Sequence, residues 1–407
     1  MLFTGTAAAQ VVNLASYPIL ARIFSPADFG VFATFVASAA IPSALACGRF
    51  ELAVPTAPSW GRFAILWLCF GVSLATGLIS SVSSAAYWLL KDGSVTPVLP
   101  VLFGLCVFLT GFCAASTLYL MRHNFYRMSS ASVVMRTGGA VATQLLLALT
   151  WKSPLALIIG FAAGLASQAM LLSWNIWRHV PPRRSSRRRV VALFRRYRRQ
   201  VTVDIPSTFI AAVSLNLLTL LLANLYGQKV VGYYALAQRI AIMPLQLFND
   251  SLSQIFFQKA ARAQQERGHF WTEMKFNLVA SGILSIGVLA FILLFARPFI
   301  SVYLGRGWER AADILILLAP MLAMRSLAMS IGTTVFILRR AQWLLIHNVA
   351  NATLVLLAFV AARTLELGVM QFVKLVVMLL ILEYGTFALF LTLRARAAAP
   401  RTADRGG

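Results

Sequence analysis

The sequence predicts an all-α polytopic membrane protein with about twelve transmembrane helices in two six-helix lobes. Three observations lead to this class. Hydrophobic residues make up 59% of the 407 residues, whereas charged residues make up only 12%. Apolar runs long enough to cross a bilayer recur along the whole chain. A short bend near the start of the chain is repeated near its middle, which indicates two related halves.

The apolar runs define the individual helices. A bilayer core about 30 Å thick needs about 20 apolar residues per helix. We expect spans at residues 2–23, 29–50, 63–90, 97–121, 131–150, 154–177, 204–226, 231–257, 276–300, 308–337, 341–362 and 369–393. Because Met1 to Asn13 contains no Lys or Arg, the first run is expected to be a retained helix and not a cleaved signal peptide. The natural start of the chain stays open.

The formal net charge of +24 would suggest a nucleic-acid partner in a soluble protein. Here, about 25 of the 36 Lys and Arg fall on alternate loops, the tail and adjoining helix ends, all on one side of the membrane. This asymmetry predicts that both termini are cytoplasmic and gives no reason to expect nucleic acid. The densest run of basic residues, Arg178 to Arg199, is interpreted as a linker that anchors the topology of the chain. Anionic lipid is its expected partner, at about 1 kcal/mol per basic residue.

The repeat predicts how the lobes are related. Aligning Gly30 with Gly232, an offset of 232 − 30 = 202, also aligns Ala21 with Ala223, Phe24 with Tyr226, Phe32 with Tyr234, Ala33 with Ala235, and Pro42 with Pro244. Chance similarity between apolar stretches is the alternative explanation. Six spans separate the copies, so both copies enter the membrane from the same side. A parallel repeat follows, with a pseudo-twofold axis along the membrane normal and a central cavity.

This repeat sets the expected domains. They are an N-terminal lobe over residues 1–177, a basic cytoplasmic linker over 178–203, a C-terminal lobe over 204–393 and a basic cytoplasmic tail over 394–407. Pro18, Pro42 and Pro244 lie inside spans, where proline removes a backbone hydrogen bond and bends the helix. We expect these prolines to act as gates or hinges.

Polar residues inside the first two spans are candidate cavity groups. Gln10, Asn13 and Tyr17 follow at helical steps of three and four, and either bind substrate or join neighbouring helices. Arg49 and Glu51 end the second span and lie about 200° apart on an ideal helix, so only one can face the cavity. The affinity of guanidinium groups for phosphate favours Arg49 as the residue that faces the cavity. The repeat favours Glu51, because the offset of 202 aligns it with Ser253 in the eighth span. The choice between them stays open.

The eighth span carries the richest polar stripe. Arg239, Gln246, Asp250 and Ser253 follow at steps of seven, four and three, which places them on one face of a helix. A polar stripe facing lipid would be costly, so this face is expected to line the cavity.

Charged residues also lie inside the last spans. Arg325 stands alone near the middle of the tenth span and is either a cavity cation or a partner of Glu383 in the twelfth span. Asp250 and Glu383 are the candidates for coupling to protons or sodium. The scattered histidines and the four cysteines predict no metal site, and no cofactor is expected.

Two blocks of sequence carry a family resemblance. The first is GTAAAQVVNLASYPILARIFSPADFGVFATF followed by GRFELAVPTAP, and the second is GYYALAQRIAIMPLQLFNDSLSQIFF. The chain resembles the bacterial polysaccharide flippases of the O-antigen translocase type, within the multidrug, oligosaccharidyl-lipid and polysaccharide exporter superfamily. It departs from that pattern before Gly5 and at RRQVTVDIPSTF, the entry to the seventh span.

The resemblance implies an inner-membrane protein, and not an enzyme, that turns an undecaprenyl-pyrophosphate-linked oligosaccharide from the cytoplasmic to the periplasmic leaflet by alternating access. The product would enter O-antigen, capsule or exopolysaccharide synthesis, with glycan polymerase and chain-length proteins as candidate partners. Guanidinium groups match phosphate oxygens bidentately, so Arg49, Arg239 and Arg325 are expected to hold the pyrophosphate.

Three alternatives remain. A multidrug-extrusion-type cation antiporter of the same superfamily would typically carry an acid in its first span, and Met1 to Ala21 contains none. A glycan polymerase or ligase needs a larger outer loop than the roughly fifteen residues around 297–310. A scaffold for glycan-assembly proteins is the third. The sequence leaves open which glycan is carried, the energy source and the oligomeric state.

Overall fold

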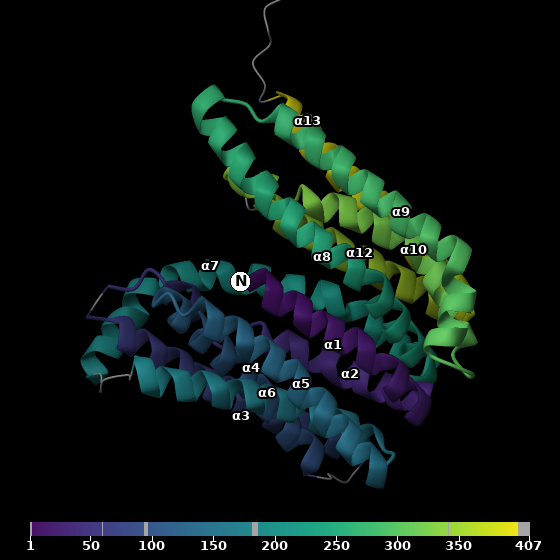
Figure 1. The fold of residues 1–407 in the computed structure, drawn as a ribbon, viewed down its shortest axis with the longest axis horizontal. Helices are drawn as coiled ribbons and strands as arrows, with labels where there is room; N and C mark the ends of the chain where they lie inside the picture. The colour runs from purple at the N-terminus through teal and green to yellow at the C-terminus, as the bar shows by residue number, and fades with distance from the viewer. Residues whose placement is uncertain (1, 59, 93–96, 181–185, 341, 398–407) are drawn as a thin grey trace, which may run out of the picture. The chain divides into compact units, whose positions relative to one another are not determined.

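The computed structural model describes residues 2–58, 60–92, 97–180, 186–340 and 342–397. Within these ranges the chain is helical and contains no β-strand (Figure 1). The elements are α1 (Leu2–Ile23), α2 (Pro26–Ser43), the 3-10 helix η1 (Phe50–Ala53), α3 (Arg62–Asp92), α4 (Val98–Arg122), α5 (Tyr126–Thr150), α6 (Pro154–His179), α7 (Arg187–Tyr226), α8 (Gln228–Arg267), α9 (Trp271–Tyr303), α10 (Glu309–Ser330), α11 (Thr334–Ile337), α12 (Gln342–Thr364) and α13 (Val369–Ala397). The predicted all-α class is confirmed.

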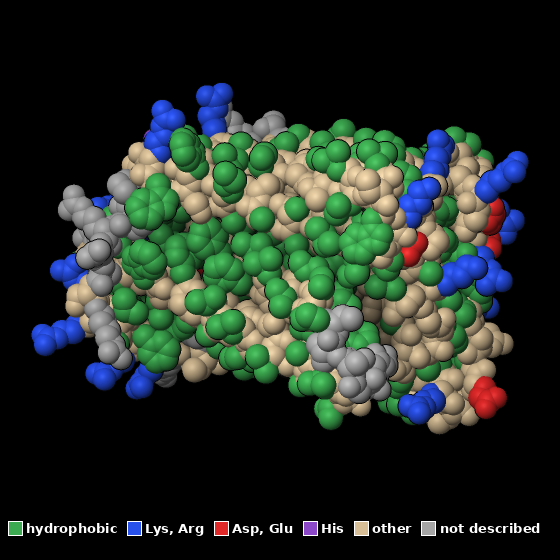
Figure 2. All heavy atoms as spheres, turned by 90° about the horizontal axis from the view of Figure 1, so that it is seen from below, with side chains coloured by type: hydrophobic (Ala, Val, Ile, Leu, Met, Phe, Trp, Pro, Cys, Tyr) green, Lys and Arg blue, Asp and Glu red, His purple; other side chains and the backbone are tan. Residues whose placement is uncertain are grey.

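Among the described residues, nine helical stretches are long and apolar enough to cross a bilayer. They are Arg62–Leu90, Val98–Arg122, Tyr126–Thr150, Pro154–His179, Asp204–Tyr226, Trp271–Tyr303, Glu309–Ile337, Gln342–Thr364 and Val369–Ala397. Figure 2 shows a face on which hydrophobic side chains cover the middle and Lys and Arg gather toward two ends. The protein is therefore a multi-pass membrane protein.

Three predicted spans fall outside these nine stretches. The spans at 2–23, 29–50 and 231–257 coincide with the helices α1, α2 and α8. The polar stripes noted above lower the apolar character of α1 and α8, while α2 has only 18 residues and carries Asp28 in its first turn. Helices of this composition are expected to face protein or water over part of their surface.

Several helix ends differ from the prediction, among them those of α2, α7, α8 and α10, where the predicted span 308–337 is divided into α10 and α11. The second span was expected to continue to residue 50, but α2 ends at Ser43 and is followed by turns up to η1. The eighth span was expected to end near residue 257, whereas α8 continues to Arg267. For α2 the physical cause is that a backbone with positive φ at Gly48 and Arg49 cannot belong to a right-handed helix.

The chain divides into two compact units, Met1–Gly232 and Tyr233–Gly407. In the first unit, α3 packs against α4, α5 against α6, α1 against α5, and α2 against α7. Small residues allow close approach, since a Cβ at Gly164 of α6 would lie 2.5 Å from the carbonyl oxygen of Arg136 in α5. This unit contains a buried core built largely from α3, α4 and α6, with the four cysteines free and buried.

The basic stretch between α6 and α7 was expected to be a linker. Residues 181–185 lie outside the described residues, but α7 begins at Arg187 and continues without a break into the seventh span. Leu193 is fully buried in the core of the first unit, and the ring of Phe194 lies 5.6 Å from that of Phe50. These contacts group α7 with the first unit, while the lobe boundary at residues 178–203 stays a prediction.

The repeated bends contact one another within the first unit. A Cβ at Gly30 would overlap the carbonyl oxygen of Gln228, and a Cβ at Gly232 would overlap that of Pro26. The contact is reciprocal, because the offset of 202 relates Pro26 to Gln228 as it relates Gly30 to Gly232. In addition, the Thr34 hydroxyl lies 2.8 Å from Gln228 Oε1. This symmetry supports a true repeat, since chance similarity gives no reason for such pairing.

In the second unit, α10 packs against α9 and α13, and α12 packs against α13. Hydroxyl and amide groups join α9 to α10 inside the unit. Asn277 donates to the carbonyl oxygen of Ser330 over 3.1 Å, and Ser281 and Ser330 lie 3.0 Å apart. Ser285 and Ser326 extend this contact at 3.1 Å. Buried polar groups that satisfy one another in this way fix the register of two membrane helices.

Candidate functional site

The polar residues of α1 lie on one helix, as the sequence predicts. Gln10 and Asn13 are half-buried, and Tyr17 is buried. Ser16, between them, donates a hydrogen bond of 2.8 Å to the carbonyl oxygen of Asn13, which is one turn earlier. Pro18 follows inside the same helix, which continues to Ile23. A role in substrate binding stays a prediction for Gln10, Asn13 and Tyr17.

The polar stripe of α8 lies on one continuous helix. Because α8 is unbroken from Gln228 to Arg267, the steps of seven, four and three place the four residues on one face. Arg239 and Gln246 are exposed, and Ser253 is half-buried. The backbone of Asp250 is helical, but its side chain lies outside the described residues. Pro244 lies in this helix between Arg239 and Gln246.

The structure removes the helical geometry on which the choice between Arg49 and Glu51 was based, and which of the two faces the cavity stays a prediction. The argument from an ideal helix does not apply, because Arg49 has φ +64° and Glu51 lies in η1. Arg49 Nη1 lies 3.3 Å from Glu51 Oε1, with side-chain exposures of 26% and 12%. The two residues therefore form one partly buried ion pair. Desolvation by burial raises the pKa of Glu51, and the positive charge of Arg49 opposes this rise.

A second arginine fixes the loop that follows this pair. Arg122, at the end of α4, donates hydrogen bonds to the carbonyl oxygens of Val54 and Ala57 over 2.7 Å and 2.5 Å. Both acceptors belong to a segment without a regular helix, so their carbonyl groups need partners. Arg122 thus holds the Arg49–Glu51 region against the end of α4. The sequence offered no periodic signal for this contact.

Arg325 lies in α10 and is half-buried. Its charge acts on the phenol groups of Tyr234 in α8 and Tyr384 in α13, which places all three side chains in one neighbourhood of the second unit. The ion pairs found among the described residues do not include Arg325. The neighbouring Ser326 accepts a hydrogen bond of 2.7 Å from Asn249 of α8.

Glu383 pairs with a histidine and not with Arg325. His347 Nδ1 of α12 lies 2.5 Å from Glu383 Oε1 of α13, and both side chains are less than 10% exposed. The imidazole stacks on Phe387 at 4.2 Å. One turn away, Asn351 donates a hydrogen bond of 3.1 Å to the hydroxyl of Tyr384. The second oxygen, Glu383 Oε2, is buried without a hydrogen-bond partner among the described groups.

Sequence reasoning identified Glu383 but not its partner. His347 lies near the start of α12, 36 residues before Glu383, and only the packing of α12 on α13 brings them together. A histidine inside an apolar run was the available signal. Within the described residues no group of three or more His, Cys, Asp or Glu side chains is placed to hold a metal ion.

The chain is similar to known proteins in sequence and in fold. A family model described as "Polysaccharide biosynthesis protein" matches residues 19–313. The Lipopolysaccharide biosynthesis protein WzxC of Escherichia coli (strain K12) is 24% identical over 183 residues, 45% of this chain and 37% of that protein. The matched part thus spans little more than a third of that relative's length.

Solved structures show the same fold. The inward-facing form of a multidrug resistance MATE family transporter of the MOP superfamily superimposes with a TM-score of 0.71 at 13% identity, covering 99% of this chain and 96% of that chain. The lipid II flippase MurJ, in an inward closed conformation, gives a TM-score of 0.70 at 15% identity, covering 97% and 91%. At these identities the similarity concerns the fold alone.

Proposed function

Because this chain belongs to the family of polysaccharide biosynthesis proteins, we propose that it flips a lipid-linked oligosaccharide across the bacterial inner membrane. The proposed substrate is an undecaprenyl-pyrophosphate-linked glycan, moved from the cytoplasmic to the periplasmic leaflet by alternating access. The product would enter the synthesis of a surface polysaccharide. The fold shared with MATE transporters and with MurJ is compatible with this activity.

The observation that carries the proposal is the position of Arg325. A guanidinium group within a membrane helix is costly unless it has a partner, and the ion pairs of the described residues leave Arg325 without an acid. A pyrophosphate supplies the missing negative charge and accepts bidentate hydrogen bonds from arginine. Arg239, on the polar face of α8, is the second proposed phosphate ligand. Arg49 is a weaker candidate, because Glu51 already compensates its charge.

Replacement of these arginines tests the binding role. Arg325→Ala and Arg239→Ala are expected to reduce surface glycan at unchanged protein abundance, with partial recovery in the Lys variants. Lys259→Ala, at an exposed position later in α8, serves as the matched control and should leave glycan output intact. Normal output in both alanine variants at the arginine positions would remove these residues from the mechanism.

The activity itself is tested in a deletion strain. We expect a lipid-linked glycan to accumulate on the cytoplasmic leaflet, detected by labelling its sugars in right-side-out and inverted vesicles. Accumulation on the periplasmic leaflet would instead indicate a defect in polymerisation or ligation. Unchanged leaflet distribution together with increased drug sensitivity would favour the extrusion of cationic drugs.

We propose that Glu383 carries the coupling ion together with His347. Two titratable groups that share a hydrogen bond inside a membrane unit can take up and release one proton, and this changes the net charge of the pair by one. Glu383→Gln is therefore expected to remove the response of transport to a proton gradient. Asn351→Ser is the matched control, because it breaks the neighbouring α12–α13 contact without removing an ionisable group.

An equal loss in Glu383→Gln and Asn351→Ser would assign the pair a purely structural role. Asp250 remains the second coupling candidate, to be tested by Asp250→Asn in the same assay. Transport that depends on sodium in all variants would exclude a proton as the coupling ion.

We also propose that both termini are cytoplasmic and that Arg178 to Arg199 lies at an anionic lipid surface. Along the first part of α7, Leu193 is buried while Arg188, Arg189 and Arg195 are exposed, as expected for an amphipathic helix beside a membrane surface. Labelling of single cysteines introduced at Arg189 and at Gly305, on opposite sides in this orientation, tests the topology. Glycan polymerase and chain-length proteins remain the proposed protein partners.

A further inference from the structure

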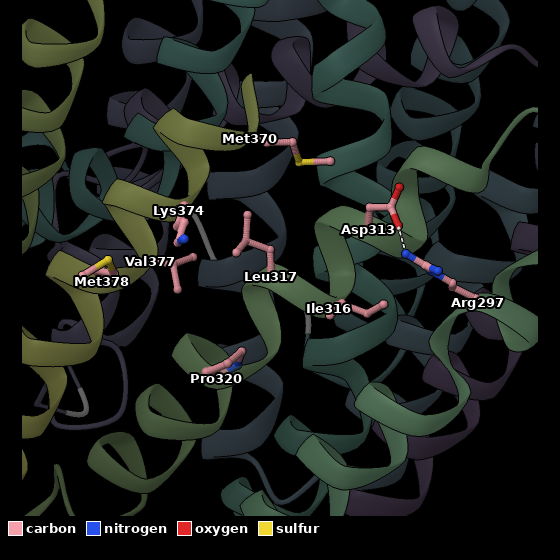
Figure 3. Close-up of a pocket in the computed structure, with 9 residues that line it drawn as sticks. All are labelled: Arg297, Asp313, Ile316, Leu317, Pro320, Met370, Lys374, Val377 and Met378. Atoms are coloured by element: carbon pink, nitrogen blue, oxygen red, sulfur yellow. Dashed lines mark hydrogen bonds and ion pairs between the residues drawn. The ribbon is translucent and has the colours of Figure 1, made fainter. Parts of the chain in front are cut away.

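The second unit contains a groove between α9, α10 and α13, with a volume of about 420 Å³. Figure 3 shows Arg297 and Asp313 on one side of it and Lys374 and Met378 on the other. The remaining lining residues are apolar: Ile316, Leu317, Pro320, Met370 and Val377. The lining of the groove does not include His347 or Glu383, and the groove has no role in the transport steps proposed above.

The groove carries an uncompensated positive charge. Arg297 Nη2 lies 3.2 Å from Asp313 Oδ1, so these two charges offset each other. Lys374 is exposed, and in the described part of the chain no ion pair engages it. Glu383, the acid nearest to it along α13, is bonded to His347. The lining therefore has a net charge of +1, from Arg297 and Lys374 against Asp313.

The charges lie at one end of the groove. Lys374 follows the start of α13 at Val369 by five residues, and Asp313 follows the start of α10 at Glu309 by four. At 1.5 Å per residue these side chains lie about 7.5 Å and about 6 Å inside their helices. Pro320 lies eleven residues into α10, about 16 Å from its start. Lys374 and Asp313 thus lie nearer the ends of their helices than Leu317, Pro320 and Met378, and so nearer the headgroups of a bilayer, while Met370 lies at the charged end.

We propose that this groove binds an anionic phospholipid. Lys374 donates hydrogen bonds to the phosphate, while the charges of Arg297 and Asp313 on the opposite side of the groove offset each other. One acyl chain packs along Leu317, Pro320 and Met378. The bound lipid joins α13 to the α9–α10 pair and stabilises the second unit. Because the site has a net positive charge, a lipid with a net negative headgroup binds better than a zwitterionic lipid with the same chains.

The test uses the full-length protein in detergent, titrated with phosphatidylglycerol or with phosphatidylcholine of identical chains. Phosphatidylglycerol is expected to raise the melting temperature in a saturable manner. In Lys374→Gln its apparent affinity should fall at least fivefold. Arg363→Gln is the matched control, since Arg363 is an exposed basic residue in the last turn of α12, at the same end but outside the groove lining.

A second variant separates the groove from simple surface charge. Leu317→Asp places an acid in the apolar wall and should weaken phosphatidylglycerol binding at least fivefold, provided that the lipid-free melting temperature is retained; if it is not, Met378→Asp at the exposed rim replaces it. Equal stabilisation by the two lipids, or an unchanged phosphatidylglycerol affinity in Lys374→Gln, would overturn the proposal. Saturable binding of undecaprenyl phosphate without competition by phosphatidylglycerol would assign the groove to the glycan carrier instead.

Discussion

The two copies of the repeated bend begin alike and end differently. In both, a glycine lets the chain approach the other copy, and a proline follows twelve residues later, Pro42 in one and Pro244 in the other. In the first copy α2 ends at Ser43, one residue after its proline, whereas α8 continues for 23 residues beyond Pro244. A proline therefore does not determine where a membrane helix ends, because packing and the following residues decide this.

The starts of the two helices also differ. Ser25 and Asp28 form a capping box at the start of α2, where the Ser25 side chain accepts from the amide of Asp28 and Asp28 accepts from that of Ser25. At the equivalent place in the second copy stands Gly227, with φ +80°. The first copy thus satisfies its free amide groups with side chains, while the second makes its turn by backbone freedom.

Disruption of the contact between the two copies of the bend should give the largest change in the free energy of unfolding. Gly30→Ala and Gly232→Ala each force a Cβ into a backbone carbonyl group, and we expect each to lower the free energy of unfolding by about 1–3 kcal/mol. The measurement is thermal unfolding in detergent. Gly71→Ala is the control, since nothing lies within 4 Å of a Cβ there. Because the halves of the contact are reciprocal, the double variant should lose less than the sum; simple additivity would contradict this coupling.

Replacement of the prolines is expected to affect stability and glycan output in opposite directions. An interior proline costs about 3 kcal/mol in a soluble helix, and neighbouring helices offset part of this cost in a membrane. We expect Pro244→Ala to stabilise α8 by about 1 kcal/mol while reducing glycan output, if the bend acts as a gate. Pro42→Ala, one residue from the end of α2, should change stability less. Increased stability with normal glycan output in Pro244→Ala would exclude a gating role.

The cap of α2 should have an intermediate effect. Ser25→Ala removes the acceptor for the amide of Asp28 and is expected to cost about 1 kcal/mol in the free energy of unfolding. Asp28→Ala removes the other half of the box, so the double variant should cost little more than Ser25→Ala alone. Full additivity of the two losses would show that the residues act independently.

The smallest effect concerns Glu51, which the repeat equates with Ser253 of α8. Burial raises the pKa of Glu51 above its ordinary value of 4.5, so the folded protein binds this proton more tightly than the unfolded chain. The stability contributed by this proton is fully present below the unfolded pKa and is lost as pH rises through the folded pKa. We therefore expect Glu51→Gln to gain stability relative to wild type as pH rises above 4.5; a stability difference that does not change with pH would contradict the prediction.

The sequence located most helices, because apolar runs and bilayer thickness leave few choices for a membrane chain. It placed the polar residues of α8 on one face, since helical periodicity alone decides that. It was wrong about α2 beyond Ser43, where turns and positive φ values at Gly48 and Arg49 replace the helix. It also missed the contacts of Arg122 and His347, whose partners lie at least 36 residues away.

What the sequence determined by itself is the membrane class, the order of the apolar helices and the repeat offset, all of which follow from composition and local spacing. Tertiary structure alone decided which charges are compensated. Glu51 forms an ion pair with Arg49, and Glu383 pairs with His347. Lys374 forms no ion pair among the described residues and faces the groove. The physical reason is that the cost of a charge in a membrane depends on what lies within a few ångströms of it, and helices distant in sequence supply those neighbours.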